Sequence, residues 1–261
     1  MMSMQPHPEG SVRFSPYLGL AENELVELAA GDDGVPADTG PAPAVARLAH
    51  DAFTGLVSSP AFVCVGGKAA ISRGTYRVGM LGELGTRDSA TSLAEGLRRF
   101  EAERAAVDND FFTYAAFFTG PVGLDETEFE AALWRQLRML NQVDDAGWDP
   151  AVSADPNDPH FSFSFDGHAY FVIGLHGGSS RWARRFAWPT LVFNPHDQFD
   201  ELRDDGRMPK WQEVIREADT QLQGSPNPNL SEFGEMPEAR QYSGKRNPRE
   251  WQCPFHAEQS D

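Results

Sequence analysis

Cysteine is scarce in this sequence: Cys64 and Cys253 are the only two among 261 residues. Two cysteines cannot build a disulfide framework, so a reducing compartment is expected. No apolar run approaches the roughly 20 residues that a membrane-spanning helix needs. The first twenty residues also lack the apolar core of a signal peptide. These absences predict a cytoplasmic protein that does not bind to a membrane.

Basic residues are few as well. The chain has 22 lysines and arginines against 39 aspartates and glutamates, which gives a net charge of −17. Nucleic acids and anionic membranes bind basic surfaces, so neither is expected as a partner. A cationic small molecule would be attracted to such a protein, although an acidic composition also serves solubility alone.

Common catalytic motifs are missing from the sequence. There is no Gly-x-Gly-x-x-Gly, no Walker loop, no Gly-x-Ser-x-Gly and no His-Glu-x-x-His. Cys-x-x-Cys is absent too, which excludes a zinc ribbon or a thioredoxin-type site. Any chemistry must therefore come from less familiar local sequences.

What the chain does contain is a globular composition with an unusual supply of phenylalanine. Hydrophobic residues make up 40%, and 18 residues are Phe, so the core and any pocket should be rich in aromatic rings. Residues 1–43 are rich in Gly, Pro, Ala and Asp and predict a mobile or surface-draped arm. Residues 44–261 predict one domain, whose turn-rich C-terminal tail wraps onto the body through Phe233, Trp251 and Phe255.

Hydrophobic periodicity predicts the regular elements of this domain. Asp125 and Glu128 form a capping-box pattern, and Asp166-Gly167 predicts a type I′ hairpin turn. Helices are expected from 44 to before Pro60 and over 89–107, 125–140 and 209–222; strands are expected over 62–65, 76–81, 111–118, 161–165, 169–173 and 191–193. The mixture predicts an α+β fold: a single domain with a mixed, largely antiparallel sheet and flanking helices. Cys64 is expected inside a buried strand.

The segment 174–186 contains the first group of candidate functional residues. His176 leaves a predicted strand into a glycine-rich loop, and Arg181, Arg184 and Arg185 follow it closely. Neutral imidazole is a common iron ligand, and arginines bind carboxylates or phosphates through their planar fork. Alternatively, the histidine bonds only the backbone and the arginines are solvated.

Two further segments carry candidates. Asn194, His196 and Gln198 lie together at a strand end and could orient a substrate or a bound water. The same segment also fits a loop and helix cap, with Asn194 or Asp197 as the capping residue. Cys253, before a proline, is either a thiolate iron ligand or a small buried residue.

Together these segments resemble the bacterial YqcI/YcgG family, from about Ala61 to Phe255. The resemblance is carried by Phe62-Val63-Cys64-Val65-Gly66-Gly67-Lys68-Ala69-Ala70, Phe129-Glu130…Leu133-Trp134…Leu137, Trp148-Asp149-Pro150, Gly174-Leu175-His176…Ser180-Arg181, Phe193-Asn194…His196…Gln198-Phe199, Ala239-Arg240-Gln241-Tyr242-Ser243-Gly244 and Trp251…Cys253-Pro254-Phe255. It implies a haem protein, with haem b as the cofactor. Characterised members of the family hydroxylate guanidino nitrogens, as in arginine-type N-hydroxylation, or oxidise 2-aminoimidazole to 2-nitroimidazole.

That implication gives the candidate residues roles. His176 is the preferred iron ligand, with His196 and Cys253 as alternatives. Arg181, Arg184 and Arg185 would bind the haem propionates, and Ser180 is a further cofactor-binding candidate. Asn194, His196 and Gln198 would act on the open side, where an amine, guanidine or amino-heterocycle is oxidised.

The oxidant expected from the resemblance is dioxygen or peroxide, while the electron donor is left open and a homodimer is allowed. Two other interpretations remain. One is a haem-binding sensor or carrier without turnover. The other is a non-haem metal enzyme that uses His176, His196 and a carboxylate.

Overall fold

A mixed sheet of five strands forms the centre of the fold, in the order β1-β2-β5-β4-β3. The computed structural model describes residues 43–106, 111–231, 233–248 and 250–257, so the predicted N-terminal arm lies outside the described residues except for Pro43. The strands are β1 (Tyr76–Glu83), β2 (Thr113–Gly120), β3 (Phe163–Phe165), β4 (His168–Leu175) and β5 (Thr190–Pro195). Only β1 and β2 pair in parallel, and the other pairings are antiparallel. The predicted α+β class with a largely antiparallel sheet is confirmed.

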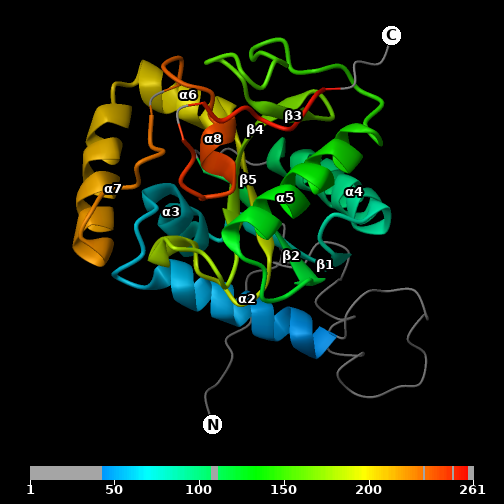
Figure 1. Cartoon of the computed structure of the whole chain (residues 1–261), viewed down its shortest axis with the longest axis horizontal. Helices are drawn as coiled ribbons and strands as arrows, with labels where there is room; N and C mark the ends of the chain where they lie inside the picture. The colour runs from blue at the N-terminus through cyan, green and yellow to red at the C-terminus, as the bar shows by residue number, and fades with distance from the viewer. Residues whose placement is uncertain (1–42, 107–110, 232, 249, 258–261) are drawn as a thin grey trace.

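Helices cover both faces of this sheet (Figure 1). Helices α4 (Arg87–Arg104) and α5 (Glu126–Asn141) pack on one face, and α2 (Pro43–Ser58) and α3 (Val65–Arg73) lie on the other. Strand alternation divides the side chains between the two layers. In β2, Tyr114 and Phe118 pack with α4 and α5, whereas Ala115 and Phe117 pack with α2. The sheet therefore has two separate apolar faces.

Two local signals read from the sequence are confirmed in the structure. Asp125 accepts hydrogen bonds from the backbone N–H groups of Thr127 and Glu128, and the Glu128 carboxylate accepts one from the N–H of Asp125. This capping box starts α5. At the β3–β4 turn, Asp166 has φ 54° and Gly167 has φ 75°. Positive φ at both positions is the geometry of a type I′ turn, which matches the twist of the two strands.

The strand predicted over 62–65 is wrong. The chain instead starts α3 at Val65, with Cys64 as the N-cap residue whose Sγ accepts a hydrogen bond from the Gly67 N–H at 3.3 Å. A run of four apolar residues fits a strand or a helix start equally well. As a result Cys64 is only partly buried, which corrects the expectation that it lies in the core.

Besides β5, the C-terminal third contains η1 (Trp182–Arg184), α6 (Asp197–Asp204), α7 (Met208–Gln223) and α8 (Ala239–Tyr242). The helix expected over 209–222 is confirmed in position. Within α7 Asp219 is buried, Trp211 and Ile215 are partly buried, and Val214 is 45% exposed. Tyr242 and Phe255 from the tail pack against Trp134 of α5. None of the described helices is long and apolar enough to cross a membrane.

Candidate functional site

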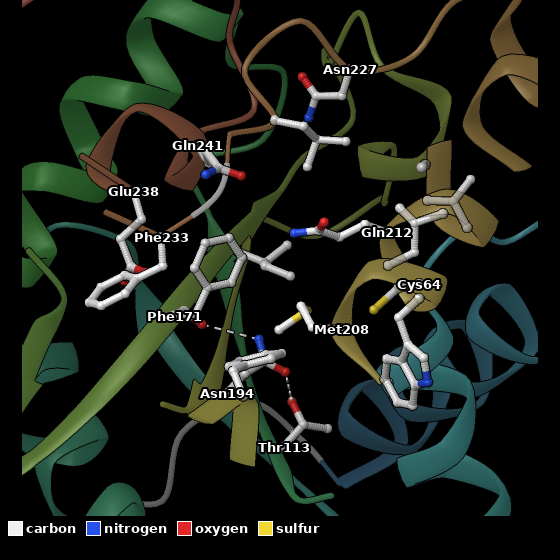
Figure 2. Close-up of a pocket in the computed structure, with 18 of the residues that line it drawn as sticks. Cys64, Thr113, Phe171, Asn194, Met208, Gln212, Asn227, Phe233, Glu238 and Gln241 are labelled. Atoms are coloured by element: carbon white, nitrogen blue, oxygen red, sulfur yellow. Dashed lines mark hydrogen bonds between the residues drawn. The ribbon is translucent and has the colours of Figure 1, made fainter. Parts of the chain in front are cut away.

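The face of the sheet that carries α3 also borders a cavity of about 260 Å³ (Figure 2). This volume is near the lower end of the roughly 300–1,000 Å³ typical of small-molecule sites. Strands β4 and β5, helices α3, α6 and α7, η1 and the tail all contribute to its wall. The apolar part of that wall includes Phe62, Val63, Phe111, Phe112, Phe171, Ile173, Leu175, Phe199, Met208, Trp211, Ile215, Leu230, Phe233 and Met236.

Strand alternation separates His176 from this cavity. Phe171, Ile173 and Leu175 of β4 line the cavity, so the next residue faces the opposite side of the sheet. There the His176 ring stacks on Phe129 of α5, with ring centroids 4.2 Å apart and planes 14° apart. Its Nδ1 lies 3.3 Å from the Leu124 carbonyl oxygen, and burial lowers the pKa of the imidazole. The preferred ligand of the sequence interpretation thus belongs to the α5 layer.

His196 is the histidine that lines the cavity. Asn194 pairs directly with Phe171 across β4 and β5, and His196 follows two residues later on the same face. The residue is 3% exposed, yet neither ring nitrogen has a hydrogen-bond partner among the described residues. The Asp200 carboxylate lies 3.3 Å from Nδ1, within ion-pair range but outside hydrogen-bond geometry. A buried polar atom needs an aligned partner, so both ring nitrogens of His196 are left unsatisfied.

The surroundings of His196 favour a neutral ring. Burial lowers the pKa of His196, and the nearby carboxylate of Asp200 opposes this only in part. The ring of Phe233 lies 4.7 Å from the imidazole, centroid to centroid. A buried neutral imidazole with unused nitrogens at a cavity wall has the properties of a metal ligand.

Asn194 and Gln198 also line the cavity, but the protein uses their amide groups. The Thr113 hydroxyl donates to Asn194 Oδ1 at 3.0 Å, and Asn194 Nδ2 donates to the Phe171 carbonyl at 3.1 Å (Figure 2). Gln198 Oε1 accepts a hydrogen bond from the Phe112 N–H at 2.9 Å. These contacts hold β2, β4 and β5 in register beneath the cavity.

Arg181 and Arg184 reach the cavity, whereas Arg185 and Ser180 do not line it. Arg181 forms a buried ion pair with Asp219 of α7 at 2.5 Å. Arg184 donates to the backbone carbonyls of Gly174 and Gln241, and burial lowers its pKa to about 10, so it stays charged. The predicted propionate-binding set is therefore divided between cavity and surface.

Arg185 donates to the Ser179 carbonyl at 2.7 Å, and Ser180 donates to Glu126 of α5 at 2.7 Å. Both hydrogen bonds stabilise the 176–186 loop. The side chains of Arg185 and Ser180 thus have partners within the protein, and no ligand is needed to explain their positions.

Glu238 is a cavity residue that the sequence interpretation missed. Its Oε1 accepts hydrogen bonds from Ser162 Oγ at 2.6 Å and Tyr242 Oη at 2.7 Å, and its Oε2 lies 4.0 Å from His196 Nε2. Burial raises the pKa of Glu238 to about 8, although both hydrogen bonds lower it. The carboxyl group is therefore mostly protonated at pH 7. Its position just before the quoted 239–244 motif is the one sequence signal that points to it.

Cys64 also contributes a polar group to the wall. It lies across the cavity from Glu238, on the side of α3 (Figure 2). Burial raises the pKa of its thiol, and the hydrogen bond from Gly67 only partly offsets this effect. Cys64 is thus present as a thiol rather than a thiolate. Among the residues that the structure describes, no group of three or more His, Cys, Asp or Glu side chains is arranged to hold a metal ion.

Comparison with known proteins explains why these segments occur together. The model of the YqcI/YcgG family matches residues 53–256 of this chain. The chain belongs to the YqcI/YcgG family. It is 30% identical over 149 residues to "Uncharacterized protein YcgG" of Bacillus subtilis strain 168, covering 54% of this chain and 57% of that relative.

A second relative from the same organism, "Uncharacterized protein YqcI", is 26% identical over 151 residues, which is 55% of this chain and 58% of the relative. The alignments thus span less than two thirds of either relative. No solved structure matches the chain.

In this YqcI/YcgG chain the motifs quoted above contribute residues to both sides of the sheet, the cavity side and the side covered by α5. The motif Phe193-Asn194…His196…Gln198-Phe199 supplies four of its residues to the cavity wall: Asn194, His196, Gln198 and Phe199. The motif around His176 contributes to both sides: Leu175 and Arg181 line the cavity, while His176 stacks on Phe129 of α5. The 239–244 motif supplies Tyr242, whose hydroxyl donates a hydrogen bond to the Glu238 carboxyl group.

The Tyr242 hydroxyl should contribute measurably to stability. It accepts a hydrogen bond from the buried Phe163 N–H at 3.0 Å and donates to Glu238 at 2.7 Å. Tyr242→Phe leaves both partners short of a bond, so we expect the free energy of unfolding to fall by about 1–3 kcal/mol in urea titrations. Tyr76→Phe is the control, because Tyr76 is only half-buried and should lose less. Equal losses in the two variants would contradict this role for Tyr242.

Proposed function

We propose that this YqcI/YcgG-family chain is a haem-dependent N-oxygenase whose iron is held by His196. The observation that supports this most strongly is the buried imidazole of His196, which lies at the wall of an aromatic cavity with no hydrogen-bond partner among the described residues. Proximal histidine is a common protein ligand of haem iron.

The cavity residues fit a flat apolar group. Phe171, Phe199 and Phe233 approach from the sheet, α6 and the tail, and Met208 and Trp211 approach from α7. Side chains of this kind provide the dry, apolar contacts that a macrocycle needs. Of the two arginines at the same wall, Arg181 is already paired with Asp219, so Arg184 carries the positive charge that a haem propionate would require.

The other two ligand candidates lie elsewhere. Cys253 is buried in the core layer formed with α4 and α5, and burial raises the pKa of its thiol to about 12, which opposes a thiolate. His176 also belongs to that layer. A non-haem site built from His176 and His196 together is not supported, because the two rings lie on opposite faces of the sheet.

When bound, haem supplies iron chemistry that activates dioxygen or peroxide. The chain's own residues would do the remaining work. The phenyl rings exclude water from the cavity, and Arg181 and Arg184 orient the bound group. Glu238 carries a carboxyl group at the wall, where it can accept a hydrogen bond from the N–H of an amine, guanidine or amino-heterocycle.

Turnover with the full-length protein tests this proposal. Protein loaded with haem is incubated with 2-aminoimidazole, arginine and simple guanidines, with dioxygen and a reductant or with peroxide. Mass spectrometry should show products that gain oxygen on nitrogen, and they should be absent with His196→Ala. Bound haem without any oxidised product would favour a sensor or carrier instead, and failure to bind haem would overturn both.

A further inference from the structure

A second, smaller cavity of about 40 Å³ lies beside the first on the same face of the sheet. Helices α2 and α3 and the strands β2, β4 and β5 border it. Its wall consists of Phe53, Val57, Phe62, Cys64, Gly67, Ile71, Thr113, Ile173, Leu175, Val192 and Asn194. We call it the side cavity.

The polar side chains of the side cavity have partners within the protein. Thr113 Oγ1 donates to Asn194 Oδ1, and Asn194 Nδ2 donates to the Phe171 carbonyl. Cys64 Sγ accepts the hydrogen bond of the Gly67 N–H. The remaining wall residues carry only aliphatic or aromatic side chains, so the side cavity offers little to a polar ligand.

Water is a poor occupant of such a space. The volume of about 40 Å³ exceeds the roughly 10–15 Å³ that one water needs. A buried water also needs two to four polar partners, and apolar cavities without them stay dry and bind xenon. An amine or guanidine would likewise leave its N–H groups unpaired there. Size and polarity together favour a small apolar molecule.

The side cavity directly adjoins the main cavity. The two share the wall residues Phe62, Cys64, Thr113, Ile173, Leu175 and Asn194. A molecule held in the side cavity is thus separated from the main cavity only by side chains that border both spaces.

We infer that the side cavity is a binding site for one small apolar gas molecule, with dioxygen as its physiological occupant. The binding of an apolar gas follows from the shape and chemistry of the wall. The choice of dioxygen rests on the proposed function, because only an oxygenase would need to hold dioxygen beside its site.

Two neighbouring glycines of α3 allow the two cavities to be filled separately. A Cβ at Gly67 would meet Val57 Cγ1 at 3.5 Å and Cys64 Sγ at 3.6 Å, which are ordinary contacts at the side cavity. A Cβ at Gly66 would meet Trp211 Cζ3 at 3.5 Å, at the main cavity. Gly67→Leu should therefore fill the side cavity, and Gly66→Leu is the matched control that extends into the main cavity. Ile71→Phe is a second filling variant, should Gly67→Leu fail to fold.

Crystals of the full chain under xenon pressure test the site without haem or turnover. We expect a xenon peak in the side cavity of the wild type, retained in Gly66→Leu and lost in Gly67→Leu or Ile71→Phe. Ordered water in the side cavity, xenon confined to the main cavity, or a peak that survives both filling variants would overturn the inference.

Dioxygen kinetics of the haem-loaded enzyme test the occupant. Gly67→Leu should raise the KM for dioxygen several-fold and leave the KM for the nitrogen substrate unchanged. An unchanged KM for dioxygen, or a rise in the substrate KM alone, would exclude dioxygen as the occupant. If the chain binds no haem, the proposed function and the dioxygen assignment fail together, while the xenon result still decides whether the gas site exists.

Discussion

His196→Ala is expected to weaken haem binding by orders of magnitude, and added imidazole should restore part of it. The substitution removes the one cavity-lining imidazole whose two nitrogens have no hydrogen-bond partner among the described residues. Free imidazole can enter the space left by the side chain and supply the same nitrogen donor. Haem titration followed by absorption spectroscopy measures the loss and the rescue.

Two matched variants make this expectation specific. His176→Ala removes a ring that stacks on Phe129 outside the cavity, so haem binding should remain near the wild-type level. Cys253→Ser should also keep it, because that thiol lies in the opposite layer. Loss of haem in His176→Ala with retention in His196→Ala would reverse the assignment and restore the original preference for His176.

Asp219→Ala is expected to destabilise the protein by about 3–5 kcal/mol, because it leaves Arg181 charged, buried and without its carboxylate. The two side chains are both buried and lie 2.5 Å apart, joining α7 to the η1 loop at the cavity wall. Gln223 supports the same junction, since its amide accepts from the Trp182 N–H and donates to the Ser180 carbonyl. Urea or guanidinium titrations measure the change.

The exposed ion pair between Arg207 and Asp205 provides the control. Its side chains are largely solvated, so Asp205→Ala should change the free energy of unfolding by less than about 1 kcal/mol. The double variant Arg181→Met with Asp219→Leu should recover most of the stability that Asp219→Ala loses, because apolar residues replace both charges. Similar small losses for Asp219→Ala and Asp205→Ala would show that the buried pair does not hold α7 in place.

The fold could be predicted where short-range signals determine it. Asp125 with Glu128, and Asp166 with Gly167, specify a helix start and a hairpin turn through contacts between near neighbours. For residues 62–65 the prediction of a strand is wrong, and the structure has a helix start there. Four apolar residues do not distinguish a strand from a helix start.

The site was harder to predict because it depends on which side of the sheet each residue faces. The sequence indicated a strand before His176, but not that Phe171 and Ile173 would face the cavity and so turn His176 away from it. Asn194, His196 and Gln198 all line the cavity because the chain passes directly from the end of β5 into α6. Glu238 was missed because its position before the 239–244 motif is only a weak signal, and its partner Ser162 is far away in the sequence.

The central claim is that His196 binds haem iron in the aromatic cavity. The most direct test is the absorption spectrum of the full-length wild-type protein titrated with haem, recorded again after reduction and addition of carbon monoxide. We expect one haem per chain and a histidine-type Soret band, distinct from that of free haem, which Cys253→Ser leaves unchanged and which His196→Ala does not form. A thiolate-type band that disappears in Cys253→Ser, or a spectrum that stays that of free haem at every haem concentration, would contradict haem binding by His196.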